Sequence, residues 1–246
     1  MTACPHGPGV ISSIGVVVPA HDEEELLPRC LAALREAAAL ATAERPGLRV
    51  RIVVATDACS DGTAALAQRA GAAVVPVSAR NVGRARAAGL REVLRTSRGR
   101  TGWLATTDAD SLVPPDWLTQ QLRYADAGWE AVAGTVTVAD WAGHSVATTT
   151  AFHHEYGGWQ GPHPHVHGAN LGFTALAYLA VGGFPGLRTA EDHALVTALE
   201  AQGRRVLRTA SLPVVTSARS SYRAPAGFGH HLTTLGGGTG SLLDAS

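Results

Sequence analysis

In the stretch WLATTDADSLVPPDWL, residues 103–118, an apolar run ends at two carboxylates. This pattern is the strongest local indication of the fold. Residues 103–107 predict a strand buried in a sheet. Asp108 and Asp110 follow with one residue between them, and alternate residues of an extended chain point to the same face. We therefore expect two hard oxygen ligands side by side at the carboxyl end of a strand, which suits Mg²⁺ or Mn²⁺. The alternative is an Asx-type turn that caps the helix predicted after the two prolines.

Three strand–helix units precede this stretch. Short apolar runs predict strands at 14–18, 50–56 and 72–77, and helical periodicity follows at 23–44, 63–71 and 84–97. Asp22 is the expected N-cap of the first helix, with Glu23 to Glu25 in its first turn. Alternating strands and helices predict an α/β fold with a parallel, doubly wound sheet, whose carboxyl edge binds ligands.

The pattern changes after about residue 130. Residues 131–141 predict another strand, followed by a stretch rich in histidine and glycine at 153–173. A short helix is expected to end at Gly182 or Gly183, and a second helix to start near Glu191. Residues 205–219 predict a last strand or pair of strands, which completes the sheet.

The composition describes an ordinary globular chain. Its 246 residues are 46% hydrophobic and 16% charged, the formal net charge is zero, and all basic residues are arginine. Zero net charge argues against nucleic acid or an anionic membrane as partner. No apolar run of 18 residues and no signal peptide is present, and the three cysteines have no metal-like spacing. We expect a cytoplasmic protein with reduced thiols and no integral membrane segment.

Five motifs in order resemble those of family 2 nucleotide-diphosphosugar glycosyltransferases, which have the GT-A fold. They are VVVPAHDEEELLPRCL, VVATDACSDGT, ARNVGRARAAGL, DAD, and HGANLGF with VGGF and AEDHAL. The resemblance implies an open, mostly parallel sheet in one domain at 13–220, with a nucleotide-sugar half at 13–112 and an acceptor-side half at 113–220. Residues 221–246 are expected to be flexible.

On the donor side, the resemblance implies contacts from residues that follow the first three strands. Glu23 would face the base or ribose, Asp57 would accept from a uracil-type imide N–H, and Arg86 would reach the diphosphate. Thr56 replaces the first of the family's usual paired aspartates, which weakens the assignment of the base. The donor-binding residues implied in this way are Pro19, Ala20, Glu23, Asp57, Gly83, Arg86, Asp108 and Arg219.

For the chemistry, the resemblance implies a divalent metal, Mn²⁺ or Mg²⁺, bound directly by Asp110. Asp108 would contact ribose or an outer-shell water. Asp192 would be the general base of an inverting transfer, oriented by Glu191; both acids also suit a helix N-terminus electrostatically.

The C-terminal region is the least specific part of the resemblance. A histidine there, His230 or His231, would supply a third metal ligand, and Arg219 or Arg223 would hold the diphosphate. The acceptor is not identified by the sequence, and neither is the sugar.

The histidines of 153–167 leave two interpretations open. His163, His165 and His167 alternate as ligands on a strand would, and His153 and His154 lie upstream. A zinc site needs converging ligands. We favour an acceptor-site loop instead, in which one or two of the histidines hydrogen-bond sugar or acceptor hydroxyls.

Two other enzyme classes and a non-catalytic role compete with this interpretation. A nucleotidyltransferase that makes a nucleotide sugar would need a Gly-rich, basic first loop, but PAHDEEE is acidic. A dinucleotide oxidoreductase would need GxGxxG after the first strand, which is absent. An inactive nucleotide-sugar-binding homologue is disfavoured by the presence of both Asp110 and Asp192.

Overall fold

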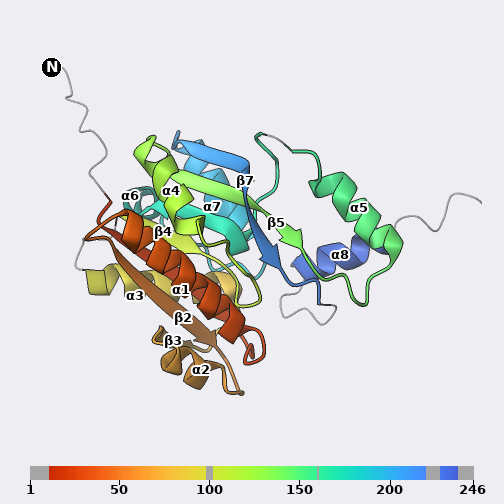
Figure 1. The fold of residues 1–246 in the computed structure, drawn as a ribbon, viewed down its shortest axis with the longest axis horizontal. Helices are drawn as coiled ribbons and strands as arrows, with labels where there is room; N and C mark the ends of the chain where they lie inside the picture. Colours follow the sequence, from red (N-terminus) through yellow and green to blue (C-terminus); the bar gives the residue numbers. More distant parts are fainter. Residues whose placement is uncertain (1–10, 98–101, 160, 220–227, 238–246) are drawn as a thin grey trace, which may run out of the picture.

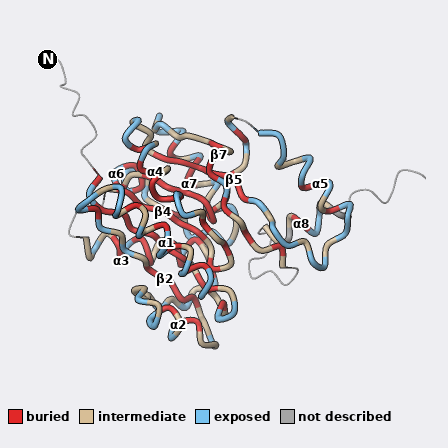
Figure 2. The backbone as a smooth tube through the Cα atoms, viewed as in Figure 1, coloured by how far each residue is buried: buried red, intermediate tan, exposed pale blue. Residues whose placement is uncertain are grey.

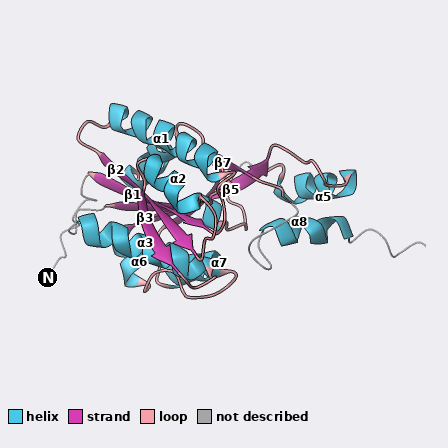
Figure 3. Ribbon diagram, turned by 90° about the horizontal axis from the view of Figure 1, so that it is seen from below, coloured by secondary structure: helices cyan, strands magenta, loops and turns pink. Residues whose placement is uncertain are grey.

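A seven-stranded sheet in the order β3-β2-β1-β4-β6-β5-β7 organises the chain (Figure 1). The structure, a computed structural model, describes residues 11–97, 102–159, 161–219 and 228–237. One face of the sheet packs against α1, α2 and α4, and the other against α3, α6 and α7 (Figure 3). Each face buries a separate apolar cluster, which is the layered α/β arrangement predicted from the sequence.

The first half contains the predicted strand–helix units. Strands β1 to β4 pair in parallel because each is joined to the next by a helical crossover. Their bounds, in chain order with the helices, are β1 Ser13–Ala20, α1 Leu27–Glu44, β2 Arg49–Asp57, α2 Thr63–Arg69, β3 Ala73–Val77, α3 Val82–Ser97 and β4 Trp103–Thr106.

The predicted start of the first helix is wrong. Helix α1 begins at Leu27, with Leu26 as N-cap and a proline in its first two positions. Asp22 instead has a positive φ of 52°, and its carboxylate accepts the N–H of Ser60 at 2.7 Å. The loop after β1 is therefore held by the loop after β2 rather than by the helix.

The second half makes the sheet mixed. Strand β6 runs antiparallel to both β4 and β5, and β7 is parallel to β5. The elements are α4 Trp117–Asp126, β5 Ala131–Val138, α5 Val146–Tyr156, the 3₁₀ turn η1 Gly168–Asn170, β6 Leu171–Thr174, α6 Ala175–Ala180, α7 Glu191–Ala201, β7 Val206–Thr216 and α8 Phe228–Gly237. Helices α5 and α8 and strand β6 are additions to the predicted elements.

Helices α5 and α8 form an arm beside the main body (Figures 1 and 3). We call residues 146–156 and 228–237 the α5–α8 arm. It is carried by the far ends of β5 and β7, beyond a register shift between Gly134 and Val136. Its small core contains Phe152, Ala218 and Leu232, whereas the central strands β1 and β4 of the main sheet are almost entirely buried (Figure 2).

Within the described ranges, none of the helices combines the length and the apolar character needed to cross a bilayer.

Candidate active site

A cleft of about 340 Å³ lies where the strands β1, β2, β4 and β7 end. This volume is in the range of small-molecule binding sites. Seven of the residues singled out in the sequence line it: Pro19, Ala20, Glu23, Asp57, Asp108, Asp110 and Arg219. The fold therefore gathers residues from four separate strand ends into one cavity, as expected for an open α/β sheet.

The two aspartates of DAD reach the cleft from a turn. Strand β4 ends at Thr106, and the N–H of Ser111 donates to the carbonyl of Asp108 at 3.1 Å. The expectation that Asp108 and Asp110 share one face of an extended strand is therefore wrong in its geometry. The helix-capping alternative is also wrong, because α4 has Asp116 as its N-cap.

Asp110 lies in a network with Arg219 and Glu23. The Arg219 guanidinium is 3.3 Å from Asp110 and donates to both carboxylate oxygens of Glu23, one of them at 2.7 Å. Burial and the nearby Asp108 carboxylate raise the pKa of Asp110 to about 7, although Arg219 opposes this. The cleft therefore holds more acidic groups than Arg219 neutralises.

Asp108 lies in a second network, with Arg86 and Glu191. Arg86 is 3% exposed and donates to Asp108 at 2.5 Å and to Glu191. Burial raises the pKa of Glu191, and Arg86 opposes that shift. Neither Arg86 nor Glu191 lines the cleft.

Asp192 is held by backbone N–H groups at the start of α7. Its carboxylate accepts from Gly168 at 2.7 Å and from His193 at 2.8 Å. It is half-buried and lies outside the residues that line the cleft. Two N–H bonds fix its orientation and leave acceptor capacity on the carboxylate.

Asp57 holds the loop after β3. Its carboxylate is buried and accepts from the backbone N–H groups of Ala79, Arg80 and Asn81 at 2.7, 2.9 and 2.7 Å. Most of its acceptor capacity is therefore used inside the protein.

Gly83 packs against the backbone of residues 185–187 and does not line the cleft. A Cβ at this position would lie 2.5 Å from the carbonyl oxygen of Pro185 and 3.0 Å from that of Leu187. The close approach made possible by this glycine is therefore between helix α3 and the 185–187 loop.

Several residues that line the cleft were not singled out from the sequence: His21, Arg80, Asn81, Arg188, Thr216, Ser217 and Phe228. Arg80 and Asn81 belong to the ARNVG motif, so a signal for them was present. Phe228 carries no such signal, because only the packing of α8 on α5 brings it to the cleft.

The histidines of residues 163–167 stack on one another and on Tyr156 of the arm. The rings of His163, His165 and His167 follow one another at centroid distances of 5.9 and 6.1 Å, and Tyr156 stacks on His165 at 4.1 Å. Burial lowers the pKa of His167 to about 3. These rings form a packed, neutral wall and, among the described residues, no convergent ligand set.

Of the two histidines proposed as a third metal ligand, only His231 has a described side chain. His231 lies 3.2 Å from Glu155 of α5, so its ring faces the arm. The side chain of His230 and residue Arg223 lie outside the described part of the chain.

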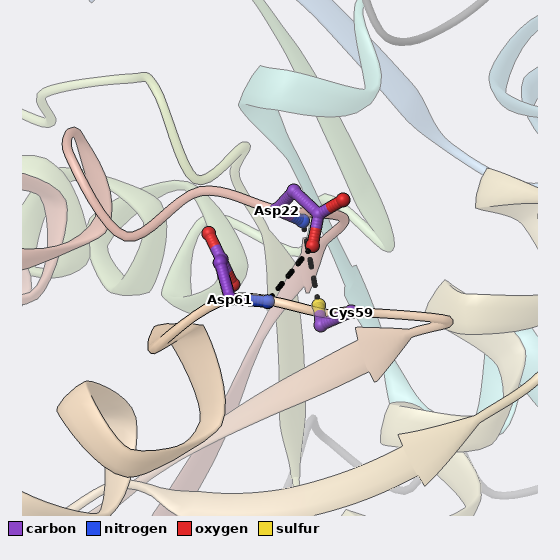
Figure 4. A group of neighbouring side chains, drawn as sticks. All are labelled: Asp22, Cys59 and Asp61. Carbon is purple, nitrogen blue, oxygen red and sulfur yellow. Dashed lines mark hydrogen bonds between the residues drawn. The ribbon is translucent and has the colours of Figure 1, made fainter.

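One cluster of possible metal ligands lies beside the cleft, in the loops after β1 and β2 (Figure 4). Ligand atoms of Asp22, Cys59 and Asp61 all lie within 4.8 Å of one another. These groups are joined by hydrogen bonds, from Asp22 N–H to Cys59 and from Asp61 N–H to Asp22. We interpret the cluster as a junction between the two loops.

Backbone strain is concentrated around the cleft. Four non-glycine residues in the described part have positive φ: Asp22, Ala58, Arg80 and Ala190. Each follows a strand end or precedes the helix that carries Asp192. Such residues cost of order 1 kcal/mol or more each and mark sites where the surroundings fix an unusual geometry.

Known structures share this fold. Residues 1–349 of S. aureus TarS in complex with UDP-GlcNAc are 13% identical with a TM-score of 0.63, over 86% of this chain and 60% of that chain. The mannosyltransferase PcManGT from Pyrobaculum calidifontis, in complex with GDP-Man and Mn²⁺, is 23% identical with a TM-score of 0.62, over 85% and 57%. The chain thus spans less than two thirds of the length of either protein.

A third structure of this fold is glucosyl-3-phosphoglycerate synthase from Mycobacterium tuberculosis, with Mn²⁺, UDP and phosphoglyceric acid. It is 16% identical with a TM-score of 0.55, over 84% of this chain and 71% of that one. No curated protein matches the chain by sequence.

The sequence profile of glycosyl transferase family 2 matches residues 15–193, which include both DAD and Asp192. This match favours a glycosyltransferase over the nucleotidyltransferase and oxidoreductase alternatives. The chain therefore belongs to glycosyl transferase family 2 and has the GT-A fold.

Proposed function

We propose that this enzyme transfers a sugar from a nucleoside diphosphosugar, with UDP-sugars favoured, to an acceptor hydroxyl with inversion and with a divalent metal. The observation that carries the proposal is the convergence of Glu23, Asp57, Asp108 and Asp110 on one cleft at the sheet edge. The nucleotides in the three similar structures, UDP-GlcNAc, GDP-Man and UDP, support this donor class.

The residues present fit a divalent cation. Asp108 and Asp110 are hard oxygen ligands, and both line the cleft. We assign direct ligation to Asp110, and a contact with ribose or an outer-shell water to Asp108. When bound, the cation neutralises the charge that develops on the departing diphosphate. Mn²⁺ in two of the similar structures supports this assignment.

We assign the general base to Asp192. Its carboxylate takes the proton of the acceptor hydroxyl while that oxygen forms a bond to the anomeric carbon. The bond from this carbon to the diphosphate oxygen breaks on the opposite face, and the nucleoside diphosphate leaves. The configuration at the anomeric carbon is inverted, and Asp192 then releases the proton to solvent.

The donor is held by residues that line the cleft. Pro19 and Ala20 border the nucleotide, Glu23 and Asp57 face its base or ribose, and Arg219 contacts the diphosphate. Gly83 contributes by setting the position of the loop that precedes α7.

The acceptor is assigned to the side of the cleft near α7 and the α5–α8 arm, where the histidine wall lies. A cytoplasmic location is supported by Cys30 and Cys59, which are both free thiols.

A thermal-shift screen tests the proposal. UDP, GDP, CDP and dTDP sugars are compared with and without Mn²⁺, since a ligand at 100 times its Kd stabilises the fold by about 2.7 kcal/mol. We expect one base to raise the Tm, and Mn²⁺ to increase that shift. Absence of any shift across the screen would contradict the donor class.

The stereochemistry is tested by the slow hydrolysis of the same donor. With water as acceptor, ¹H NMR identifies the anomer of the sugar that is released first. Inversion is expected, and a first product with the donor's configuration would refute it.

A further inference from the structure

Arg86 connects the two acidic parts of the site. Its guanidinium donates to Asp108 of the DAD turn at 2.5 Å and to Glu191 at the start of α7. These partners are 22 and 105 residues away in the sequence. Because Arg86 is 3% exposed and does not line the cleft, its two hydrogen-bonding ends are directed into the protein.

The same guanidinium packs on Gly168, which also bonds to Asp192 and to Thr106. A Cβ on Gly168 would lie 2.3 Å from guanidinium atoms of Arg86, so a larger residue there would displace the guanidinium. The Gly168 N–H holds Asp192 at 2.7 Å, and its carbonyl accepts from Thr106, the last residue of β4, at 2.7 Å.

Stability alone is a weak reason for such a buried arrangement. Burying two charges removes their hydration, and a buried ion pair is often no more stabilising than apolar residues of similar volume. Here the charged side chains of Arg86, Asp108 and Glu191 lie together. The Nε of Arg86 has no hydrogen-bond partner among the described residues. The arrangement instead fixes geometry.

We infer that Arg86 is a positioning residue, which sets the DAD turn and the start of α7 relative to each other. The inference rests on the proposed function, in which Asp108 serves the donor and Asp192 the acceptor. Without the guanidinium, the carboxylates of Asp108 and Glu191 would repel each other, and both segments would move apart.

Lysine cannot replace this arginine. A guanidinium is a planar fork whose separate nitrogens bind two carboxylates at once, whereas an ammonium is a single point of charge. Arg86→Lys therefore keeps the charge and removes the bridge.

The test compares three variants. Arg86→Lys breaks the bridge, Glu191→Gln releases only the α7 side, and Arg91→Lys changes an exposed arginine on the same helix as a control. The readouts are the Kd of UDP with Mn²⁺ by calorimetry, and kcat for hydrolysis of the UDP-sugar selected by the thermal-shift screen. A nucleotide of another base is used if that screen selects it.

We expect a split between binding and turnover. Removal of such a supporting partner typically changes metal affinity or activity by 10- to 100-fold. Arg86→Lys should therefore weaken the Kd and lower kcat, each at least tenfold. Glu191→Gln should lower kcat at least tenfold and leave the Kd within twofold, because Arg86 still holds Asp108. Arg91→Lys should match wild type.

A folded Arg86→Lys protein with Kd and kcat within twofold of wild type would overturn the inference. So would a Glu191→Gln variant that weakens UDP binding as much as Arg86→Lys does. If Arg86→Lys does not fold, Glu191→Gln decides alone, and unchanged kcat would then overturn the inference.

A measurement that does not depend on enzymatic activity separates this inference from the proposed function. The thiol of Cys30 is buried and donates to the carbonyl of Asp108 at 3.3 Å, so its accessibility reports on the DAD turn. In a background of Cys4→Ser and Cys59→Ser, Arg86→Lys should speed labelling of Cys30 by a disulfide reagent at least tenfold. An inactive wild type would refute the proposed function, whereas unchanged Cys30 labelling in Arg86→Lys would refute the inference.

Discussion

The carboxylate of Asp57 gives the most direct test of how the cleft is built. It is 4% exposed and accepts three backbone N–H groups from residues 79–81. The middle residue, Arg80, has a φ of 45°, which is unfavourable for any side chain with a Cβ. Asp57 therefore holds a strained loop whose residues Arg80 and Asn81 line the cleft.

Asp57→Ala removes all three bonds at once. A hydrogen bond to a charged group contributes about 1.5–3 kcal/mol. We take the lower value because water can enter from the cleft, so the three bonds represent about 4.5 kcal/mol. Release of the strain at Arg80 returns about 1 kcal/mol, and a net loss of about 3.5 kcal/mol remains. For a chain of this size the Tm should fall by about 7–14 °C.

Asp57→Asn should cost less, about 2 kcal/mol. Its carbonyl can still accept from Ala79 and Arg80, but its amide places donors against the N–H of Asn81. Urea unfolding monitored by circular dichroism measures both variants. The control is Asp116→Ala, an exposed aspartate whose side chain makes no capping bond, which should change stability by less than about 0.5 kcal/mol.

The reasoning is refuted if Asp57→Ala loses less than about 1 kcal/mol with an unchanged dependence on urea. Loss of UDP binding in such a stable variant would instead make contact with the base the main role of Asp57. Loss of stability before any ligand is added would make loop support its first role.

Four further changes test other parts of the site. Asp110→Asn should weaken Mn²⁺-dependent UDP binding at least tenfold in calorimetry, and equal affinity would refute the metal assignment. Asp192→Asn should lower kcat by about 10²–10⁴-fold with unchanged Kd for UDP, and wild-type turnover would place the base elsewhere. Gly168→Ala forces Arg86 away, and should cost about 1–3 kcal/mol in urea unfolding. The folded-state pKa of His167 is about 3, so below pH 6.5 the unfolded state binds more protons and stability falls. Relative to His167→Gln, wild type should lose about 2 kcal/mol between pH 8 and 5, and parallel pH profiles would refute this.

Strands β1 and β4 could be predicted because they are buried on both faces. Val16, Val17 and Val18 of β1 are all fully buried, so the strand is a continuous apolar run in the sequence. Strand β6 has only four residues, Leu171–Thr174, and lies between two other strands. Too few residues remain there for periodicity to distinguish a strand from a loop.

Helices α5 and α8 depend on each other. Helix α5 contains three consecutive threonines and α8 contains three glycines, and both residue types are poor helix formers. They form where Phe152 and Leu232 pack together, which local propensity does not encode. A local signal exists for α5, since Ser145 accepts the N–H of Thr148 as an N-cap.

At the site, the sequence identified most of the acidic residues but not their partners. Asp57 ends strand β2, Asp108 and Asp110 come soon after β4, and the carboxyl ends of parallel strands share one edge. Glu23 and Arg219 are 196 residues apart, and the sequence has no feature that pairs them. The pairing is a consequence of the tertiary fold, which brings the end of β7 beside the end of β1.

The two arginine networks differ in access, and this difference assigns their functions. The Arg219 side chain is 23% exposed and lines the cleft, whereas Arg86 is buried with both ends occupied. A diphosphate entering the cleft can therefore meet the guanidinium of Arg219, which is paired with Glu23, whereas Arg86 lies outside the cleft lining. Of these two arginines, both of which the family resemblance offers for the diphosphate, we expect Arg219 to contact it and Arg86 to hold the acids in place.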